Sequence, residues 1–136
     1  MTAEGKRVTL AWEHDLVFRG GEAGGPTTVI DGDNAAAPGP MLTLLLAAAA
    51  CSGADVVTIL EKMRVALREF RIEASGARRE DPPRRYTALH LTYHLHGDGL
   101  DQAKARRAVE LSIEKYCSVL HSLAPDIQVT HDIVLG

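Results

Sequence analysis

The chain has 136 residues, of which 46% are hydrophobic, and its formal net charge at neutral pH is −3. This length and apolar content suit a single domain, residues 1–136, with a substantial core. No basic stripe alternates with aromatic residues, so the composition argues against a nucleic-acid partner. The arginine pairs around Pro82-Pro83 are typical of a solvated hairpin loop.

The sequence also limits where the protein works. Residues 1–10 lack the apolar core of a signal peptide. The most hydrophobic stretch, residues 41–60, is interrupted by Ser52, Gly53 and Asp55, and its unbroken part is too short to cross a bilayer of about 30 Å. We therefore expect a cytoplasmic protein with no membrane partner, whose thiols stay reduced.

The N-terminal third predicts β-strands. Short runs of strand-forming residues occur at 8–12, 15–19 and 27–30, and the glycine-rich segment 20–26 forms a turn between the last two. Asp-Gly-Asp-Asn at 31–34 is a further turn signal.

A helix then follows the proline-glycine-proline segment 38–40. Residues 41–50 are apolar on every side, which predicts a helix buried all round in a core or an interface. From Asp55 to Phe70 the apolar residues keep helical spacing on one side only, and Ser52-Gly53 bends or divides the two parts. Because one layer of sheet hardly covers such a helix, we expect a dimer that shares it.

The C-terminal half predicts two strands, a helix and a last strand. Residues 70–77 and 86–96 alternate between apolar and polar side chains, and the loop between them makes a hairpin. An i, i+3, i+4, i+7 stripe predicts a helix over 101–120, and 127–135 is a final strand. The order of elements favours an α+β fold in which antiparallel sheet packs on central helices.

Two cysteines, Cys51 and Cys117, are the only ones in the chain, and each lies in an apolar helical pattern. A pair that meets in space supports thiol peroxidase chemistry, because the second thiol closes a disulfide on the sulfenic acid of the first. The alternative is that both pack as small hydrophobic residues, and Asp55 favours it by disfavouring a thiolate at Cys51.

Two long motifs carry a family resemblance. Residues 51–64 read Cys-Ser-Gly-Ala-Asp-Val-Val-Thr-Ile-Leu-Glu-Lys-Met-Arg, and residues 111–119 read Leu-Ser-Ile-Glu-Lys-Tyr-Cys-Ser-Val. Together with the Pro-Met before the buried helix, they resemble the OsmC-like branch of the OsmC/organic hydroperoxide resistance (Ohr) family. The order of strands and helices matches this family over nearly the whole chain.

The resemblance implies an OsmC-like fold in which antiparallel sheets wrap around two long central helices of an intertwined homodimer. It implies two sites at the subunit interface, with Cys51 as the peroxidatic and Cys117 as the resolving cysteine. It further implies oxidoreductase activity on organic hydroperoxides or hydrogen peroxide, in defence against oxidative stress, with recycling by a dithiol reductant and no cofactor.

The chain departs from the hydroperoxide-resistance branch at one expected site position. That branch has a glutamate directly after the proline of its Asn-Pro-Glu motif, and Met41 stands here instead. Arg19 is the candidate for the family's catalytic arginine, with a solvated loop arginine as the alternative. We expect Met41, Leu45 and Tyr116 to form an apolar substrate pocket that favours organic hydroperoxides.

Histidines offer another possible chemistry. His90, His94 and His96 share one strand face, so a metal site competes with a plain solvent-facing sheet. A zinc site needs further ligands that the sequence does not place, so we expect no metal. His121, one turn after Cys117, either tunes that thiol or ends its helix.

These observations lead to one leading hypothesis and one alternative. The first is a thiol-dependent peroxidase, an enzyme that uses the Cys51–Cys117 pair. The second is a redox-sensing or apolar-ligand-binding dimer of the same fold without efficient turnover.

Overall fold

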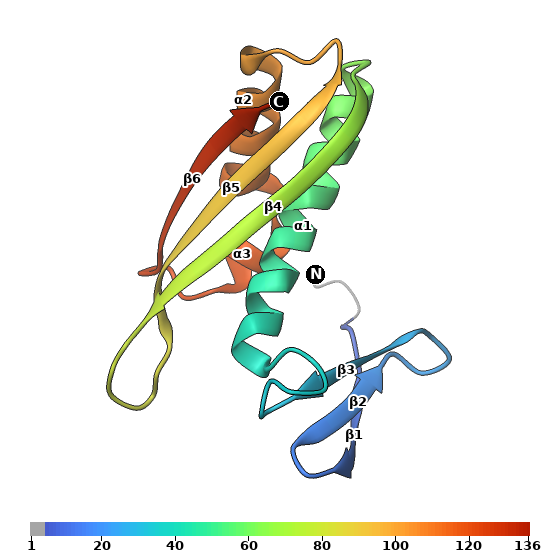
Figure 1. Cartoon of the computed structure of the whole chain (residues 1–136), viewed down its shortest axis with the longest axis vertical. Coiled ribbons are helices and arrows are strands. Elements are labelled where there is room, and N and C mark those ends of the chain that lie inside the picture. Colours follow the sequence, from blue (N-terminus) through green and yellow to red (C-terminus); the bar gives the residue numbers. More distant parts are fainter. Residues whose placement is uncertain (1–4) are drawn as a thin grey trace. The chain divides into compact units, whose positions relative to one another are not determined.

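The computed structural model describes residues 5–136, which form two units (Figure 1). One unit ends at Leu44 and the other runs from Leu45 to Gly136. The prediction of a single domain over residues 1–136 stays a prediction.

The first unit contains a three-stranded antiparallel sheet. Its strands are β1 (Thr9–His14), β2 (Val17–Gly21) and β3 (Thr27–Asp31), in the order β1-β2-β3. The three predicted strands are therefore confirmed, with β1 and β2 placed one or two residues later than expected. Gly24 lies in the predicted turn with a φ of 74°, a conformation that glycine adopts without strain.

Asp31 organises the loop that leads from β3 to the first helix. Its side chain is buried and accepts hydrogen bonds from the backbone N–H groups of Asp33, Ala35 and Ala36 at 2.8, 3.2 and 2.8 Å. These bonds, that of Ala36 first, lower the pKa of the Asp31 carboxyl below its usual value. The turn predicted over 31–34 is thus held by a buried carboxylate.

Helix α1 (Pro40–Lys62) runs without interruption through Ser52 and Gly53. The expected bend there is wrong. Both residues face the second sheet and are buried, and a Cβ on Gly53 would lie 3.3 Å from Cδ1 of Ile72. The glycine therefore lets α1 approach the sheet. By length and composition alone α1 is long and apolar enough to span a membrane.

The helix ends earlier than its periodicity predicts. After Lys62 the chain turns at Arg64, whose φ is 61°, and β4 (Ala66–Arg78) begins. Leu67 and Phe70, which we assigned to the helical stripe, belong to this strand. Their three-residue spacing fits the helical period, and in the strand a register shift between Leu67 and Glu69 interrupts the two-residue alternation. The left-handed Arg64 decides where the helix stops.

The second unit is built on a sheet of three strands in the order β4-β5-β6. The predicted hairpin is confirmed and longer than expected, since β4 pairs antiparallel with β5 (Tyr86–Asp98) from Ala66↔Asp98 to Arg78↔Tyr86. On β5 the predicted alternation also holds. One face buries Leu89, Leu91, Tyr93 and Leu95, and the other carries the three histidines.

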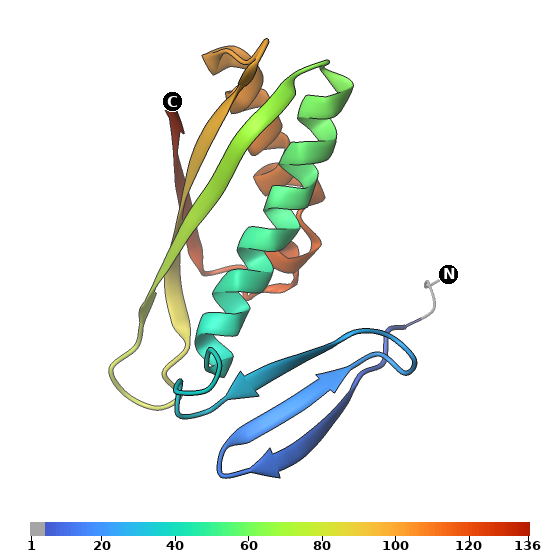
Figure 2. The same ribbon diagram turned by 45° about the vertical axis from the view of Figure 1, so that its right-hand side comes forward.

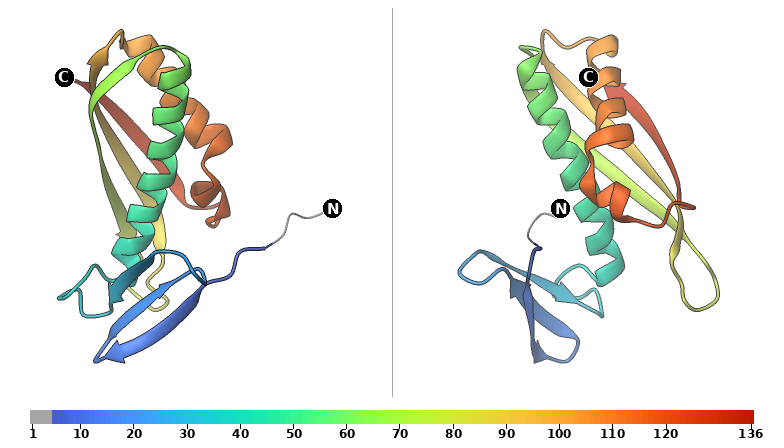
Figure 3. Two further views of the ribbon diagram at one scale, coloured as in Figure 1. Left: turned by 90° about the vertical axis from the view of Figure 1, so that its right-hand side faces the viewer. Right: turned by 180° about the vertical axis from the view of Figure 1, so that it is seen from behind.

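The last strand, β6 (Gln128–Leu135), pairs parallel with β5, so the expectation of a purely antiparallel sheet is wrong. The reason is the connection. Between β5 and β6 the chain crosses over through a helical segment, and such a crossover returns in the same direction as the strand it left. Figures 2 and 3 show α1 and this helical segment on the same face of the sheet.

The helix predicted over 101–120 is broken into three pieces. They are α2 (Gln102–Leu111), capped by Asp101, the π-helix η1 (Ser112–Tyr116) and α3 (Ser118–Ser122). Cys117 stands between the last two with φ −69° and ψ 98°, an extended conformation. The i, i+3, i+4 pattern continues through the break, which is why periodicity alone did not reveal it.

Candidate redox site

The structure brings the two cysteines together from segments far apart in the sequence. Cys51 lies on α1 and Cys117 at the break between η1 and α3, and both are free thiols. The Cys51 thiol lies beside that of Cys117 and interacts with it directly. Cys117 is fully buried, whereas Cys51 is half-buried. A reagent from solvent therefore reaches Cys51 more easily.

Burial determines the protonation state of Cys117. Loss of solvent, together with the neighbouring Cys51 thiol, raises the pKa of Cys117 to about 11, although the backbone N–H of Leu120 partly opposes this. The only other polar neighbour of its sulfur in the described hydrogen bonds is the Ala48 carbonyl oxygen, at 4.0 Å. At neutral pH Cys117 is thus a protonated thiol and a poor first nucleophile.

A buried chain of hydroxyl groups lies next to the cysteine pair. Ser52 Oγ is 2.6 Å from the hydroxyl of Tyr93 and 2.8 Å from Oγ of Ser112. Ser112 Oγ in turn donates to Oδ2 of Asp55 at 2.9 Å. Ser52, Tyr93 and Ser112 are all fully buried, and this hydroxyl chain links α1, β5 and η1.

The Asp55 carboxylate determines which hydroxyl group donates in each bond of the hydroxyl chain. Carboxylate oxygens accept hydrogen bonds, so Ser112 donates to Asp55, Ser52 donates to Ser112, and Tyr93 donates to Ser52. Burial raises the pKa of Tyr93 to about 12, which keeps its hydroxyl protonated as this direction requires. Asp55 also helps to raise the pKa of Cys117, as a minor cause after burial.

Arg19, the candidate catalytic arginine, lies on β2 in the first unit. Its guanidinium is 3.3 Å from Oε2 of Glu13 and 3.4 Å from Oγ1 of Thr27, both within the same sheet. It is half-exposed, and so is Glu13. A role of Arg19 at Cys51 stays a prediction.

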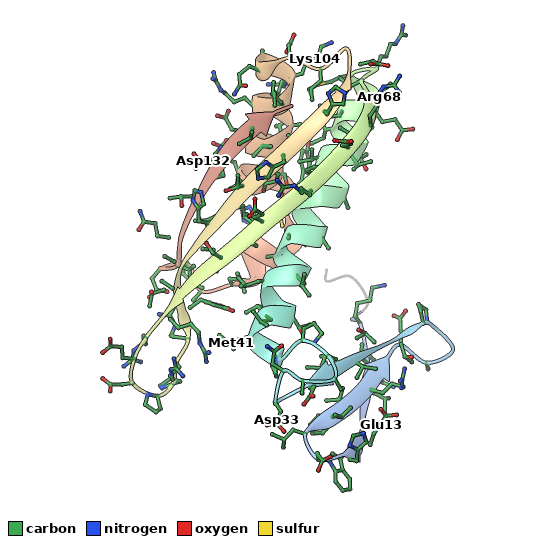
Figure 4. The ribbon with its side chains drawn as sticks, in the orientation of Figure 1. Glu13, Asp33, Met41, Arg68, Lys104 and Asp132 are labelled. Carbon is green, nitrogen blue, oxygen red and sulfur yellow. The ribbon has the colours of Figure 1, made fainter. Side chains whose placement is uncertain are left out.

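The three residues expected to line an apolar pocket differ in exposure. Leu45 is buried in the second unit and Met41 is half-buried at the start of α1 (Figure 4). Tyr116 is 49% exposed, and the Lys115 ammonium lies 5.2 Å from its ring centre. The pocket stays a prediction.

The histidines of β5 are engaged in pairwise hydrogen bonds on the outer face of the sheet. His90 lies 2.6 Å from Thr130 and 3.1 Å from Asp132, which Figure 4 labels on β6. His94 lies 2.6 Å from Glu73, and His96 donates to the Gly136 carbonyl. Within residues 5–136 no three His, Cys, Asp or Glu side chains are grouped as metal ligands.

His121 spans the helix break. Its Nε2 donates to the carbonyl oxygen of Ile113 at 3.1 Å, so the imidazole joins α3 to η1 around Cys117. It is an exposed helix-terminal contact, which agrees with the second of the two roles considered for it.

Sequence reasoning missed the hydroxyl chain. The helical stripe over 101–120 and the alternation over 86–96 treat Ser112 and Tyr93 only as inward-facing positions. A signal was available, because a polar group on a buried face must find a hydrogen-bond partner. Three buried polar groups on segments that pack together are therefore expected to be hydrogen-bond partners of one another.

Comparison with known proteins places the chain in a family. The model for OsmC-like proteins matches residues 31–132. Protein YhfA of Escherichia coli strain K12 is 40% identical over 123 residues, which cover 90% of this chain and 92% of YhfA. The chain belongs to the OsmC family. The resemblance inferred from the two cysteine motifs is thereby confirmed.

Solved structures agree on the fold of this OsmC protein. A hypothetical protein from Aquifex aeolicus VF5 superposes with a TM-score of 0.84 at 29% identity, over 98% of this chain and 99% of that one. The organic hydroperoxide resistance protein OhrB of Bacillus subtilis gives 0.62 at 15% identity, over 96% and 98%. The OsmC-like α+β fold is therefore confirmed.

Proposed function

We propose that this OsmC protein is a thiol-dependent peroxidase that reduces organic hydroperoxides in the cytoplasm as a defence against oxidative stress. The observation that carries the proposal is the pair of adjacent thiols, one half-buried and one fully buried, on the two family motifs. Relatives of the same fold include proteins described as organic hydroperoxide resistance proteins.

The proposed reaction begins at Cys51. Its thiolate attacks one peroxide oxygen, the O–O bond breaks, and the departing alkoxide takes a proton and leaves as an alcohol. Cys51 is then a sulfenic acid. The Cys117 sulfur attacks the Cys51 sulfur, an S–S bond forms, and the sulfenic hydroxyl leaves as water with the thiol proton of Cys117. A dithiol then reduces the disulfide by exchange.

The difference in burial supports this assignment of roles. Cys117, with a pKa of about 11, is protected from direct oxidation and reacts only when its neighbour becomes an electrophile. The half-buried Cys51 meets the peroxide first. No metal or organic cofactor takes part in this scheme.

The first test compares three proteins in single-turnover oxidation by cumene hydroperoxide. Wild-type protein should consume one equivalent and lose two thiols per chain. Cys51→Ser should reduce consumption to that of buffer alone. Cys117→Ser should still consume peroxide but should accumulate over-oxidised Cys51, because no second thiol protects the sulfenic acid. Unchanged consumption by Cys51→Ser would overturn the proposal.

The alternative function is a redox sensor or apolar-ligand-binding module of the same fold. Two observations favour it: Met41 stands where related enzymes have a glutamate, and Arg19 is bonded to Glu13 and Thr27 within its own sheet. In this case Cys51 would react with cumene hydroperoxide only as fast as an ordinary thiol.

The same proposal includes a homodimer. Large apolar side chains are exposed on α1 at Leu46 and Val57, and on β1 at Leu10 and Trp12, with exposed fractions between 43% and 65%. On α1 the small residues Ala50 and Ala54 complete an exposed stripe between them. A second copy that covers these surfaces would give the intertwined dimer that the family resemblance implies, and sedimentation equilibrium measures it.

A further inference from the structure

Ser112 holds an unusual position between the two cysteine-bearing segments. Its side chain is fully buried, and its hydroxyl contacts Ser52 and Asp55, the residues directly after and one turn after Cys51. A third, longer contact at 3.4 Å reaches the backbone carbonyl of Ser52. Through its side chain, Ser112 is therefore fixed to the part of α1 that carries Cys51.

The backbone of Ser112 is fixed to the other cysteine. Its carbonyl oxygen accepts the N–H of Cys117 at 2.7 Å, a bond across five residues that defines the π-helix η1. A π-helical turn is wider than an α-helical one; it is rare, and it frequently occurs at functional sites. Here it ends at Cys117, whose extended backbone interrupts the helix.

We propose that Ser112 is a positioning residue that sets the approach of Cys117 to Cys51 for disulfide closure. Disulfide geometry is narrow, with Cα atoms about 4.4–6.8 Å apart, so small shifts of one segment matter. Ser112 joins the two segments directly, by side chain on one side and by backbone on the other. Without its hydroxyl, η1 loses its polar attachment to α1 while Ser52 and Asp55 lose a partner.

This inference deepens the proposed function but can be tested without a peroxide. In thiol–disulfide exchange, two cysteine thiols are oxidised to a disulfide while oxidised glutathione is reduced to two thiols, so electrons and protons balance. The equilibrium constant with the glutathione couple measures how well the two thiols are held together. It does not depend on whether Cys51 reacts with hydroperoxides.

The experiment measures this constant for wild-type protein, Ser112→Ala, Ser112→Thr and the matched control Ser118→Ala. Ser118 is an exposed serine directly after Cys117. We expect Ser112→Ala to lower the constant about tenfold or more, the size of effect that one lost hydrogen bond to a buried group produces. Ser112→Thr keeps the hydroxyl and should recover most of the loss, and Ser118→Ala should leave the constant unchanged.

A folded Ser112→Ala protein with the wild-type constant would overturn the proposal. If that variant does not fold, Ser52→Ala removes one of the two side-chain contacts of Ser112 on α1 and should lower the constant in the same direction by a smaller factor, while Asp55 remains as the second contact. A tenfold lower constant for Ser112→Ala, together with slow oxidation of the wild-type protein by cumene hydroperoxide, would support the positioning role and contradict the peroxidase. Fast oxidation of the wild-type protein, together with an unchanged constant for Ser112→Ala, would support the peroxidase and contradict the positioning role.

Discussion

The two faces of the sheet β4-β5-β6 carry polar groups in very different surroundings. On the inner face Tyr93 is fully buried, and its hydroxyl belongs to the chain that ends at Asp55. On the outer face, one residue further along β5, His94 contacts the exposed Glu73. Neighbouring residues of one strand thus make bonds of similar length whose loss should have very different consequences, because water replaces a lost partner on the outer face only.

The sharpest contrast between the faces concerns apolar packing. Leu91 is 1% exposed on the inner face, and Thr92 follows it on the outer face. Leu91→Ala should lower the free energy of unfolding by about 2–5 kcal/mol, because it removes buried contacts and leaves a cavity. Thr92→Ala should cost less than about 1 kcal/mol, the range of strand preferences. Urea unfolding measures both, and equal losses would contradict the contrast.

The next effect concerns the buried hydroxyl. Tyr93→Phe keeps the ring, which packs against Phe70 and His131 with centroids 6.5 Å away in each case, and removes only the donor to Ser52. We expect a loss of about 1–2 kcal/mol, since Ser52 keeps Ser112 as a second partner. The variant should unfold at a lower urea concentration, with an unchanged dependence of the free energy of unfolding on urea. A loss of free energy of zero or less would mean that the hydroxyl chain contributes nothing to stability.

The smallest effect is expected on the outer face of the sheet and depends on pH. Arg71 and then His94 lower the pKa of the Glu73 carboxyl, so the ionised form stabilises the folded protein above the usual glutamate pKa. This contribution is lost as the pH falls through the lowered value. Glu73→Gln should therefore lower the melting midpoint at pH 6 by at most about 2 °C and have no effect near pH 2. Calorimetry at both values checks the sign.

Local sequence patterns predicted the helices and strands better than they predicted where a helix ends or is interrupted, or how a strand pairs. Alternation and helical spacing identified the hairpin, α1 and the final strand because these signals lie within one element. The positive φ at Arg64, the extended backbone at Cys117 and the parallel pairing of β6 do not alter the periodicity, so periodicity alone does not reveal them.

For the site, the family motifs pointed to both cysteines, and the structure places them side by side. The motifs did not point to the hydroxyl chain, whose members are about 40 and 60 residues apart in sequence. Ser52 and Ser112 lie inside the two quoted motifs, but only packing makes them partners.

The parallel pairing of β6 also bears on how the chain folds. The β4–β5 hairpin joins residues close in sequence, whereas the bond from His90 to Thr130 spans 40 residues and requires α2, η1 and α3 to be in place between them. Closing so long a segment is slow compared with forming a hairpin. We expect β5 to keep an open edge until β6 arrives, which gives a transient intermediate a surface for pairing with other chains.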